Sequence, residues 1–167
     1  TPAQVVVTPQ AAQDSPTPTV RLSEIERVVN SGFEADLEGW YSEGAVTTLA
    51  DDTVSGSRAL VLPPDGGFVD QRLKFLPGTT YRLTGWGKIA ERGDTLELGI
   101  HFRNEAGERL RDLEPRPVQF TSRKFTQKSL DFTVPEGVAS VSVYLWKPSG
   151  KGVALADDIS VRSLVPD

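Results

Sequence analysis

The chain of 167 residues contains no cysteine, no methionine and a single histidine, His101. Without cysteine there is no disulfide framework, no thiolate metal ligand and no Cys–His catalytic pair. The sequence also has no Gly-x-Ser-x-Gly nucleophile turn and no phosphate-binding glycine motif between a strand and a helix. The carboxylates Glu97, Asp112 and Glu114 could in principle hydrolyse a glycoside, but no motif singles them out. We therefore expect a protein that is not an enzyme.

Long apolar runs and excess positive charge are missing too. No stretch approaches the ~18 apolar residues that a membrane helix needs, so we expect no membrane span. The 18 basic residues are outnumbered by 23 acidic ones, for a net charge of −5, which disfavours nucleic acid as the partner. With 38% hydrophobic and 25% charged residues, the composition is typical of a globular domain.

Methionine is absent even at position 1, where the chain begins Thr-Pro-Ala-Gln. We interpret this start as that of a mature product whose signal peptide has been removed, which predicts a secreted protein, extracellular or on a cell surface. The alternative is a trimmed fragment of a longer chain.

Residues 1–19 differ in composition from the rest, with prolines spread among Gln, Thr, Ser and Ala. This pattern predicts an extended tail or linker. Within it, Val5, Val6 and Val7 form an isolated β-branched run. Two interpretations stay open: a tail with a chance valine run, or a strand that pairs with an exposed sheet edge of another copy.

From residue 20 to residue 167 the sequence predicts one all-β domain. Short alternating runs are separated by Gly, Pro and Asp turns, as in an antiparallel sandwich. Strands are expected near 45–50, 58–63, 67–75, 80–89, 95–103, 125–134, 138–147 and 153–162.

Two segments give weaker signals. Ser23 followed by Glu26 resembles a capping box, so a helical turn is possible before a strand-like stretch at 27–29. Residues 105–124 form a long charged connection in which Pro115 and Pro117 oppose regular structure.

Alternation within the strands separates a core face from an outer face. Leu96, Leu98, Ile100 and Phe102 are predicted to face the core, as are Val141, Val143 and Leu145. Three strands would then offer aromatic and polar groups on the outer face: Trp86, His101, Arg103, Tyr144 and Trp146. Exposed aromatic rings beside hydrogen-bonding groups suit sugar rings. The alternative is that loops cover Trp86 and Trp146. Trp40 and Tyr41 are expected to pack at one end of the sandwich.

Two carboxylates stand where a strand or turn has no ordinary use for them. Asp157 falls on the same apolar face as Leu155 and, by simple alternation, as Ile159 and Val161. An inward carboxylate must be protonated, paired or bound to a cation. Glu34 lies in a Gly-Phe-Glu turn near the start of the domain. If the first and last strands lie together, the two carboxylates can share one hard cation such as calcium.

A family resemblance runs through residues 28–163. Its motifs are Asn30-Ser-Gly-Phe-Glu34, Leu37-Glu-Gly-Trp40, Ser55-Gly-Ser-Arg-Ala-Leu60, Leu76–Trp86, Phe132–Gly137, Val143–Trp146 and Ala156–Ser160. Their order and spacing resemble the carbohydrate-binding modules of the galactose-binding-like β-sandwich superfamily, of the family 4, 9, 16 and 22 type. The resemblance implies an antiparallel jelly-roll β-sandwich that binds glycan in a groove across one sheet.

The resemblance also implies a structural calcium ion. In that family the ion takes a turn carbonyl, the Glu carboxylate, a carbonyl near the Ser-Gly-Ser turn and the first Asp of an Asp-Asp pair. Those ligands correspond to Gly32, Glu34, about Ser57, and Asp157. A hydrogen-bonded Glu and Asp without a metal is the alternative.

Two functions from different classes follow. The first is a secreted, non-catalytic carbohydrate-binding module that recognises a polysaccharide or a cell-surface glycan through Trp86, His101, Arg103, Tyr144 and Trp146. The second is the structural subunit of an extracellular homopolymer, in which the tail with Val5, Val6 and Val7 adds a strand to a neighbouring copy.

Overall fold

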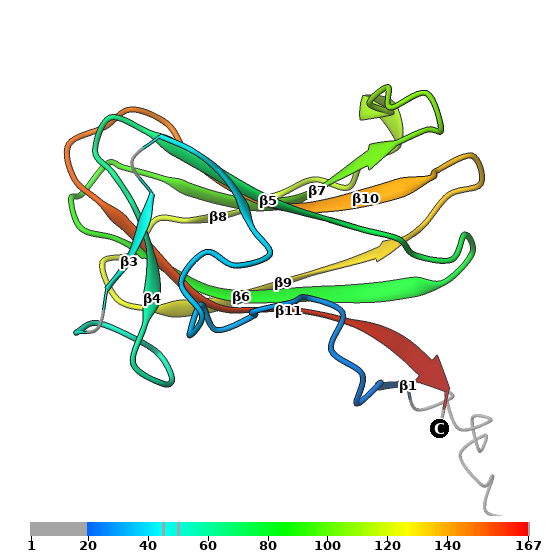
Figure 1. Cartoon of the computed structure of the whole chain (residues 1–167), viewed down its shortest axis with the longest axis horizontal. Coiled ribbons are helices and arrows are strands. Elements are labelled where there is room, and N and C mark those ends of the chain that lie inside the picture. Colours follow the sequence, from blue (N-terminus) through cyan, green and yellow to red (C-terminus); the bar gives the residue numbers. More distant parts are fainter. Residues whose placement is uncertain (1–19, 45, 50, 167) are drawn as a thin grey trace, which may run out of the picture.

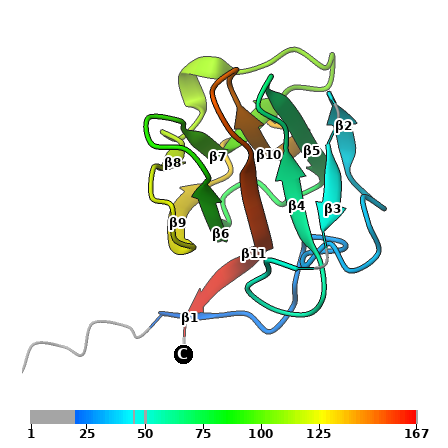
Figure 2. The ribbon, with the colours of Figure 1, turned by 90° about the vertical axis from the view of Figure 1, so that its left-hand side faces the viewer.

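The computed structural model consists of two antiparallel sheets stacked face to face (Figures 1 and 2). The strands bury their apolar faces between the two sheets. The structure describes residues 20–44, 46–49 and 51–166. Within these residues the predicted all-β, jelly-roll β-sandwich is confirmed. No helix in these ranges is long and apolar enough to cross a membrane.

The strands and one short 3₁₀ helix follow the chain in the order β1 (Val20–Leu22), β2 (Tyr41–Glu43), β3 (Thr47–Leu49), β4 (Ala59–Leu62), β5 (Gly67–Leu73), β6 (Thr80–Ile89), β7 (Leu96–Arg103), η1 (Arg111–Leu113), β8 (Val118–Phe120), β9 (Thr126–Thr133), β10 (Ser140–Lys147) and β11 (Ala154–Pro166). One sheet has the order β3-β4-β11-β6-β9, with β1 paired to β11, and the other has the order β2-β5-β10-β7-β8. We call the second the groove sheet and the first the back sheet.

Each of the eight strands expected from alternation is present, with ends that differ by up to a few residues. The core faces of β7 and β10 are as predicted: Leu96, Leu98, Ile100 and Phe102, with Val141, Val143 and Leu145, are buried between the sheets. Phe33 and Trp40 add to the core from the turn before β2, with ring centroids 5.1 Å apart.

The predicted core face of β11 is wrong at Leu155 and Asp157, which face away from the core, and right at Ile159 and Val161, which lie in it. Ala154 and Ala156 pair with inward positions of β6, whereas the pairing jumps from Asp157↔Trp86 to Ser160↔Thr84. This β-bulge inserts one residue, and Asp158 takes a left-handed backbone with φ of 49°. The bulge inverts the alternation, so Ile159 faces the core while Asp157 faces away from it.

Two further expectations are corrected. Residues 23–29 form no helix, because the Ser23 hydroxyl accepts from the Ile25 N–H, two residues on. Glu26 instead accepts the Val161 N–H of β11 at 2.9 Å, which ties this segment along the last strand. The connection over residues 105–124 is not irregular throughout, since it contains η1 and β8.

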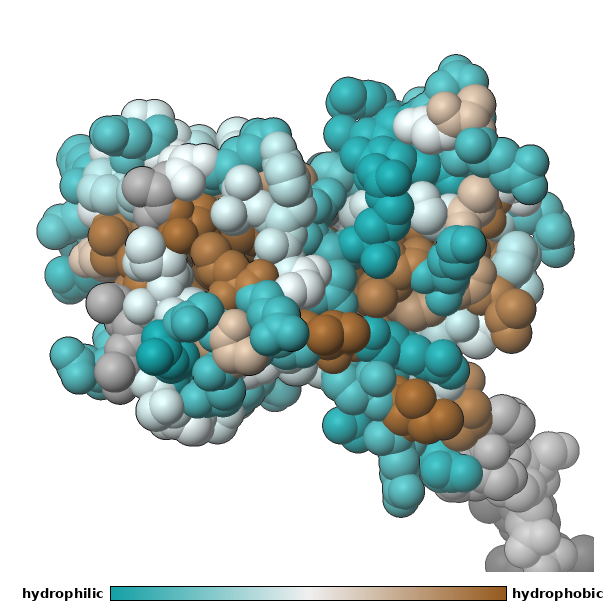
Figure 3. Space-filling model, viewed as in Figure 1, coloured by the Kyte–Doolittle hydropathy of each residue, from teal (hydrophilic) through white to brown (hydrophobic). Residues whose placement is uncertain are grey.

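The strand-exchange hypothesis rests on Val5, Val6 and Val7, which lie outside the described residues. It stays a prediction. Within the described residues, hydrophobic surface on the side shown in Figure 3 lies in separate patches among hydrophilic residues.

Phe120 of the unpredicted strand β8 crosses the core to the back sheet. A β-carbon added to Gly87 of β6 would lie 2.7–2.9 Å from three atoms of the buried Phe120 ring. Gly87 therefore provides the space in which this ring lies.

We expect Gly87→Ala to lower the free energy of unfolding by about 1–3 kcal/mol, because the buried ring must shift to admit the methyl group. Thr84→Ala, on the opposite face of the same strand, is the matched control and should cost less. Urea unfolding measures both. Equal stability of Gly87→Ala and wild type would show that the core tolerates the added group.

Candidate functional site

The outer face of the groove sheet is hollowed into a groove of about 780 Å³. Its walls come from β2, β5, β7, β10 and the loop after β7, and its lining residues are Tyr41, Glu43, Phe68, Asp70, Arg72, His101, Arg103, Arg109 and Trp146. Cross-strand register brings them together. One row runs Glu43, Phe68, Trp146 and Glu97 across four strands, and the next runs Tyr41, Asp70, Tyr144 and Gly99.

Aromatic side chains gather at one end of this groove. Trp146 of β10 and Tyr41 of β2 are the most exposed, at 43% and 58%. Phe68 of β5 lies directly across from Trp146 and places its ring centroid 6.1 Å from that of Tyr144. These rings present apolar faces to the groove beside carboxylate and guanidinium groups.

Tyr144 forms part of the groove floor. It faces outward, as predicted, yet is 6% exposed, because its ring lies over Gly99. A β-carbon on Gly99 would lie 2.7 Å from the Tyr144 hydroxyl, which donates to Glu97 Oε2 at 2.8 Å. Burial and this bond raise the pKa of the Tyr144 phenol. Tyr144 therefore stays protonated and supports the other rings.

His101 stacks on Tyr144, with ring centroids 4.0 Å apart. Its Nδ1 atom is buried without a hydrogen-bond partner among the described residues. Burial, followed by the positive charge of Arg109, lowers the pKa of His101 to about 4. The imidazole is therefore neutral at neutral pH and can both donate and accept a hydrogen bond.

Guanidinium groups occupy the other end of the groove. Arg103 donates from Nη1 to the Ser142 hydroxyl at 2.9 Å, and Arg72 pairs across the strands with Ser142. Burial raises the pKa of Asp70 in spite of the opposing effect of Arg103 and Arg72.

Arg109 and Glu114 build the wall beyond β7. Arg109 donates from Nε and Nη2 to the two oxygens of Glu114, at 3.0 and 2.7 Å. Glu114 also accepts the Phe102 N–H of β7 at 2.9 Å. Burial acts to raise the pKa of Glu114, but the bonds from Arg109 and Phe102 lower it overall. This pair holds the 109–114 segment against the sheet.

Four of the five residues expected to bind glycan are brought together in the groove sheet: His101, Arg103, Tyr144 and Trp146. The fifth, Trp86, is not. It lies on the outer face of the back sheet, across from Asp157 on β11 and Gln127 on β9. Alternation along β6 indicated an outward side chain correctly but does not tell in which of the two sheets a strand lies.

Trp40 and Tyr41 were both expected to pack at one end of the sandwich, and only Trp40 is packed. Trp40 is buried and its Nε1 donates to the Asn30 carbonyl at 3.2 Å. Tyr41 instead lines the groove, with its hydroxyl 2.9 Å from Glu43 Oε1.

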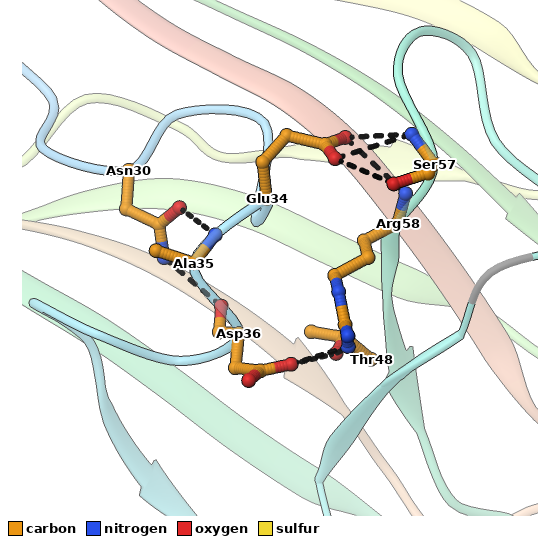
Figure 4. Close-up of polar contacts among 7 residues, drawn as sticks. All are labelled: Asn30, Glu34, Ala35, Asp36, Thr48, Ser57 and Arg58. Carbon is orange, nitrogen blue, oxygen red and sulfur yellow. Dashed lines mark hydrogen bonds and ion pairs between the residues drawn. The ribbon is translucent and has the colours of Figure 1, made fainter.

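The Asn30–Trp40 turn is organised by one side chain (Figure 4). The Asn30 amide nitrogen donates to the Asp36 and Glu38 carbonyls at 2.9 and 3.0 Å, and its oxygen accepts the Ala35 N–H at 3.0 Å. Asn30 has φ of 55°, a backbone that asparagine adopts more readily than most residues. The turn directs Phe33 into the core and leaves Glu34 outside.

Three distant segments meet beside this turn. Glu34 accepts the Ser57 N–H at 3.0 Å, the Ser57 hydroxyl at 3.0 Å and the Arg58 N–H at 3.2 Å. Asp157 accepts the N–H groups of Val54 and Ser55 at 2.9 and 3.2 Å. The two carboxylates thus hold the 54–58 loop between them, and we call this arrangement the clamp. The sequence had predicted that Glu34 and Asp157 come together if the first and last strands lie side by side.

The four residues expected to hold calcium all lie at this clamp. A β-carbon on Gly32 would lie 3.9 Å from Asp157 Oδ1 and 3.3 Å from Asp158 Oδ1. Asp157 is fully buried, and its pKa is raised by burial and by the charge of Asp158. Glu34 has a lowered pKa, chiefly through the Ser57 N–H.

The charge of this set suits a hard cation, because the buried Asp157 lies next to Asp158 and contacts the same loop as Glu34. The partners of the Glu34 and Asp157 oxygens are N–H and O–H donors, which a bound cation would have to displace or share. Among the described residues, no three His, Cys, Asp or Glu side chains could hold a metal by themselves. Carbonyl oxygens would therefore have to complete the coordination.

Six of the nine residues that line the groove were not predicted to bind glycan: Tyr41, Glu43, Phe68, Asp70, Arg72 and Arg109. For β5 the sequence shows no alternation, because Phe68 and Val69 are both apolar and residues 70–72 are all polar; the burial of Gln71 appears only in the structure. For β2, three residues are too few to show a period. Arg109 lies in a loop, where alternation does not apply.

Comparison with known proteins gives the family. The profile of a family described as a carbohydrate-binding domain matches residues 26–152. A keratan-sulfate endo-1,4-β-galactosidase from Sphingobacterium multivorum is 23% identical over 148 residues, which cover 87% of this chain and 33% of that enzyme. The chain thus spans about a third of the length of this relative.

Solved structures share the fold. A family 16 carbohydrate-binding module superposes with a TM-score of 0.69 at 22% identity, covering 81% of this chain and 98% of the module. A module named CBM61, solved in complex with β-1,4-galactotriose, gives a TM-score of 0.64 at 16% identity, covering 86% of this chain and 99% of the module.

His101 makes stability depend on pH in a defined window. The unfolded chain takes up a proton on this side chain near its ordinary pKa of 6.5, whereas the folded chain does so only near pH 4. The unfolded state therefore binds more protons between these values, and stability falls as pH drops through them.

We expect the free energy of unfolding of wild type, minus that of His101→Phe, to decrease steadily from pH 7 to pH 4.5. Phenylalanine keeps a ring over Tyr144 and cannot titrate. Urea unfolding at several pH values measures the difference, in which other titrating groups cancel. A difference that stays constant with pH would contradict the buried, neutral imidazole.

Proposed function

Because the chain belongs to this carbohydrate-binding domain family, we propose that the groove sheet binds a polysaccharide or glycan chain. The observation that carries the proposal is the groove of about 780 Å³, in which Tyr41, Phe68 and Trp146 lie beside hydrogen-bonding side chains. Apolar rings with a few polar groups are the usual lining of a ligand site.

Each part of the groove has a role in this proposal. The exposed rings of Trp146 and Tyr41 stack on the C–H faces of sugar rings. Neutral His101 and the carboxylates of Glu43 and Asp70 exchange hydrogen bonds with sugar hydroxyls. Tyr144 and Glu97, bonded to each other, hold the floor in place. The groove runs over several strands and is open to solvent, as a chain ligand requires.

The ligands to test first come from the names of similar proteins. Those names include keratan sulfate with an endo-1,4-β-galactosidase, β-1,4-galactotriose with a binding module, and xylan with another module. We propose a β-linked polysaccharide of this kind, met outside the cell that makes the protein.

We also propose that binding occurs without hydrolysis by this domain. Glu43, Glu97 and Glu114 each already accept a hydrogen bond from a tyrosine or an arginine of the groove. A glycosidase pair needs one carboxyl with a raised pKa facing an ionised partner across the sugar. Burial raises the pKa of Asp70, and Arg103 and Arg72 are the charged groups that oppose this rise.

Calcium is proposed as a structural ion at the clamp formed by Glu34 and Asp157 around the 54–58 loop. Gly32 and Ser57 would supply peptide oxygens, and Asp158 lies close by. Such an ion would offset the burial of Asp157 beside a like charge. None of these residues lines the groove, so the role of the ion would be one of stability.

We expect Trp146→Ala to weaken glycan binding by about 10- to 100-fold, since it removes the largest ring that stacks on the ligand. Trp86→Ala is the matched control, because it removes the same side chain from the back sheet and should leave affinity unchanged. Affinity electrophoresis on β-1,4-galactan, keratan sulfate and xylan, followed by calorimetry, measures both. A wild type that none of a broad glycan panel retards would refute the proposed function.

If calcium binds the clamp, 1 mM CaCl₂ should raise the melting temperature relative to excess chelator. At about 100 times the Kd the ion adds roughly 2.7 kcal/mol, or about 5–10 °C for a domain of this size. Asp157→Asn should lose this response. Identical melting curves in calcium and in chelator would rule the ion out.

A further inference from the structure

The two ends of the groove differ in charge. The register places Phe68, Trp146 and Tyr41 in two neighbouring rows, and places Arg72, Ser142 and His101 together in the row after them. Arg103 follows one row further along β7. The groove therefore runs from an aromatic end to an end rich in guanidinium groups.

Arg72 and Arg103 both line the groove, on neighbouring rows of the sheet. Arg103 reaches back from its own row to donate to the Ser142 hydroxyl at 2.9 Å, and Ser142 is the residue directly across from Arg72. Among the described residues, neither guanidinium forms an ion pair with a carboxylate within the 4.0 Å limit that defines one. Both charges therefore remain available to a ligand in the groove.

The carboxylates nearby do not cancel this charge. Glu114 is already engaged by both donor nitrogens of Arg109. Asp70 is influenced by both Arg72 and Arg103, so that two guanidinium groups act on one carboxylate. Glu43 and Glu97 lie in the aromatic rows, each bonded to a tyrosine hydroxyl. The arginine end thus keeps an excess of positive charge.

This local charge contrasts with the chain as a whole, whose net charge is −5. The net negative charge of the chain repels an anionic polymer, so any attraction of such a polymer to the groove has to come from the local charge of the arginines. Two planar guanidinium groups beside a hydroxyl suit directed hydrogen bonds to a carboxylate or sulfate.

We propose that the groove recognises an acidic glycan, with one carboxylate or sulfate group of the sugar chain bound between Arg72 and Arg103. The neighbouring sugar rings lie over Phe68, Trp146 and Tyr41. This inference rests on the proposed function and adds the class of ligand. A neutral glycan would leave the guanidinium groups facing its hydroxyls without a matching charge.

Two matched pairs of β-linked polymers test it: β-1,4-linked polymannuronate against its methyl ester, and keratan sulfate against the same polymer after chemical desulfation. In each pair only the acidic group changes, and the two pairs distinguish carboxylate from sulfate. We expect wild type to bind the acidic member of at least one pair tenfold or more tightly, with an affinity that falls as salt rises.

Variants of the two arginines test whether they bind the acidic group of the polymer. Arg103→Gln and Arg72→Gln should each lower affinity for the acidic polymer about tenfold and leave the neutral one nearly unchanged, while Arg103→Lys should retain part of the preference. Arg123→Gln, an exposed arginine outside the groove, is the matched control for loss of one charge. Melting curves verify that each variant is folded.

The possible results distinguish a failure of this inference from a failure of the proposed glycan binding on which it rests. If acidic and neutral members bind equally while Trp146→Ala weakens both, glycan binding stands and the acidic ligand is wrong. If the acidic preference persists in Arg103→Gln, Arg72→Gln and the double variant, the location is wrong. If no member of either pair and no neutral glycan binds, the proposed function fails as well.

Discussion

The pairing register of β10 is the constraint on which the candidate site depends. β10 is the central strand of the groove sheet, between β5 and β7, and its outer positions lie opposite the outer positions of both neighbours. A slip of one residue would move Tyr144 and Trp146 to the core face. The register is held because Val141, Val143 and Leu145 are buried on the other face, and because Gly99 leaves the space that the Tyr144 ring fills.

The clamp around the 54–58 loop has a comparable role at the edge of the back sheet. Asn30 shapes a turn that buries Phe33 and exposes Glu34, and the bulge at Asp158 turns Asp157 out of the core toward the same loop. These elements come from the beginning, the middle and the end of the domain. Of the two carboxylates, Asp157 is buried and Glu34 is exposed, so the calcium ion that we propose at this junction would chiefly offset the burial of Asp157.

The two faces of the groove sheet differ in packing and in exposure. Its inner face is closely packed, whereas its outer face carries rings that are not covered and charges that are not all paired. Tyr144 and His101 are buried enough to shift their pKa values, and both rings support Phe68 by stacking beside it. This support orders the exposed side chains before any ligand arrives, which lowers the entropic cost of binding.

The sequence by itself determined the fold class, the eight main strands, the core faces of β7 and β10, and the meeting of Glu34, Ser57 and Asp157. Periodicity and ordered motifs are local properties, and a chain carries them without its partners. Only the tertiary structure decided that Trp86 lies on the back sheet while Trp146 lies in the groove. It also decided that Tyr41, Arg72 and Arg109 join the groove and that a bulge inverts β11. Alternation reports which way a side chain points from its strand, whereas strand order, register and bulges depend on contacts between segments far apart in the chain.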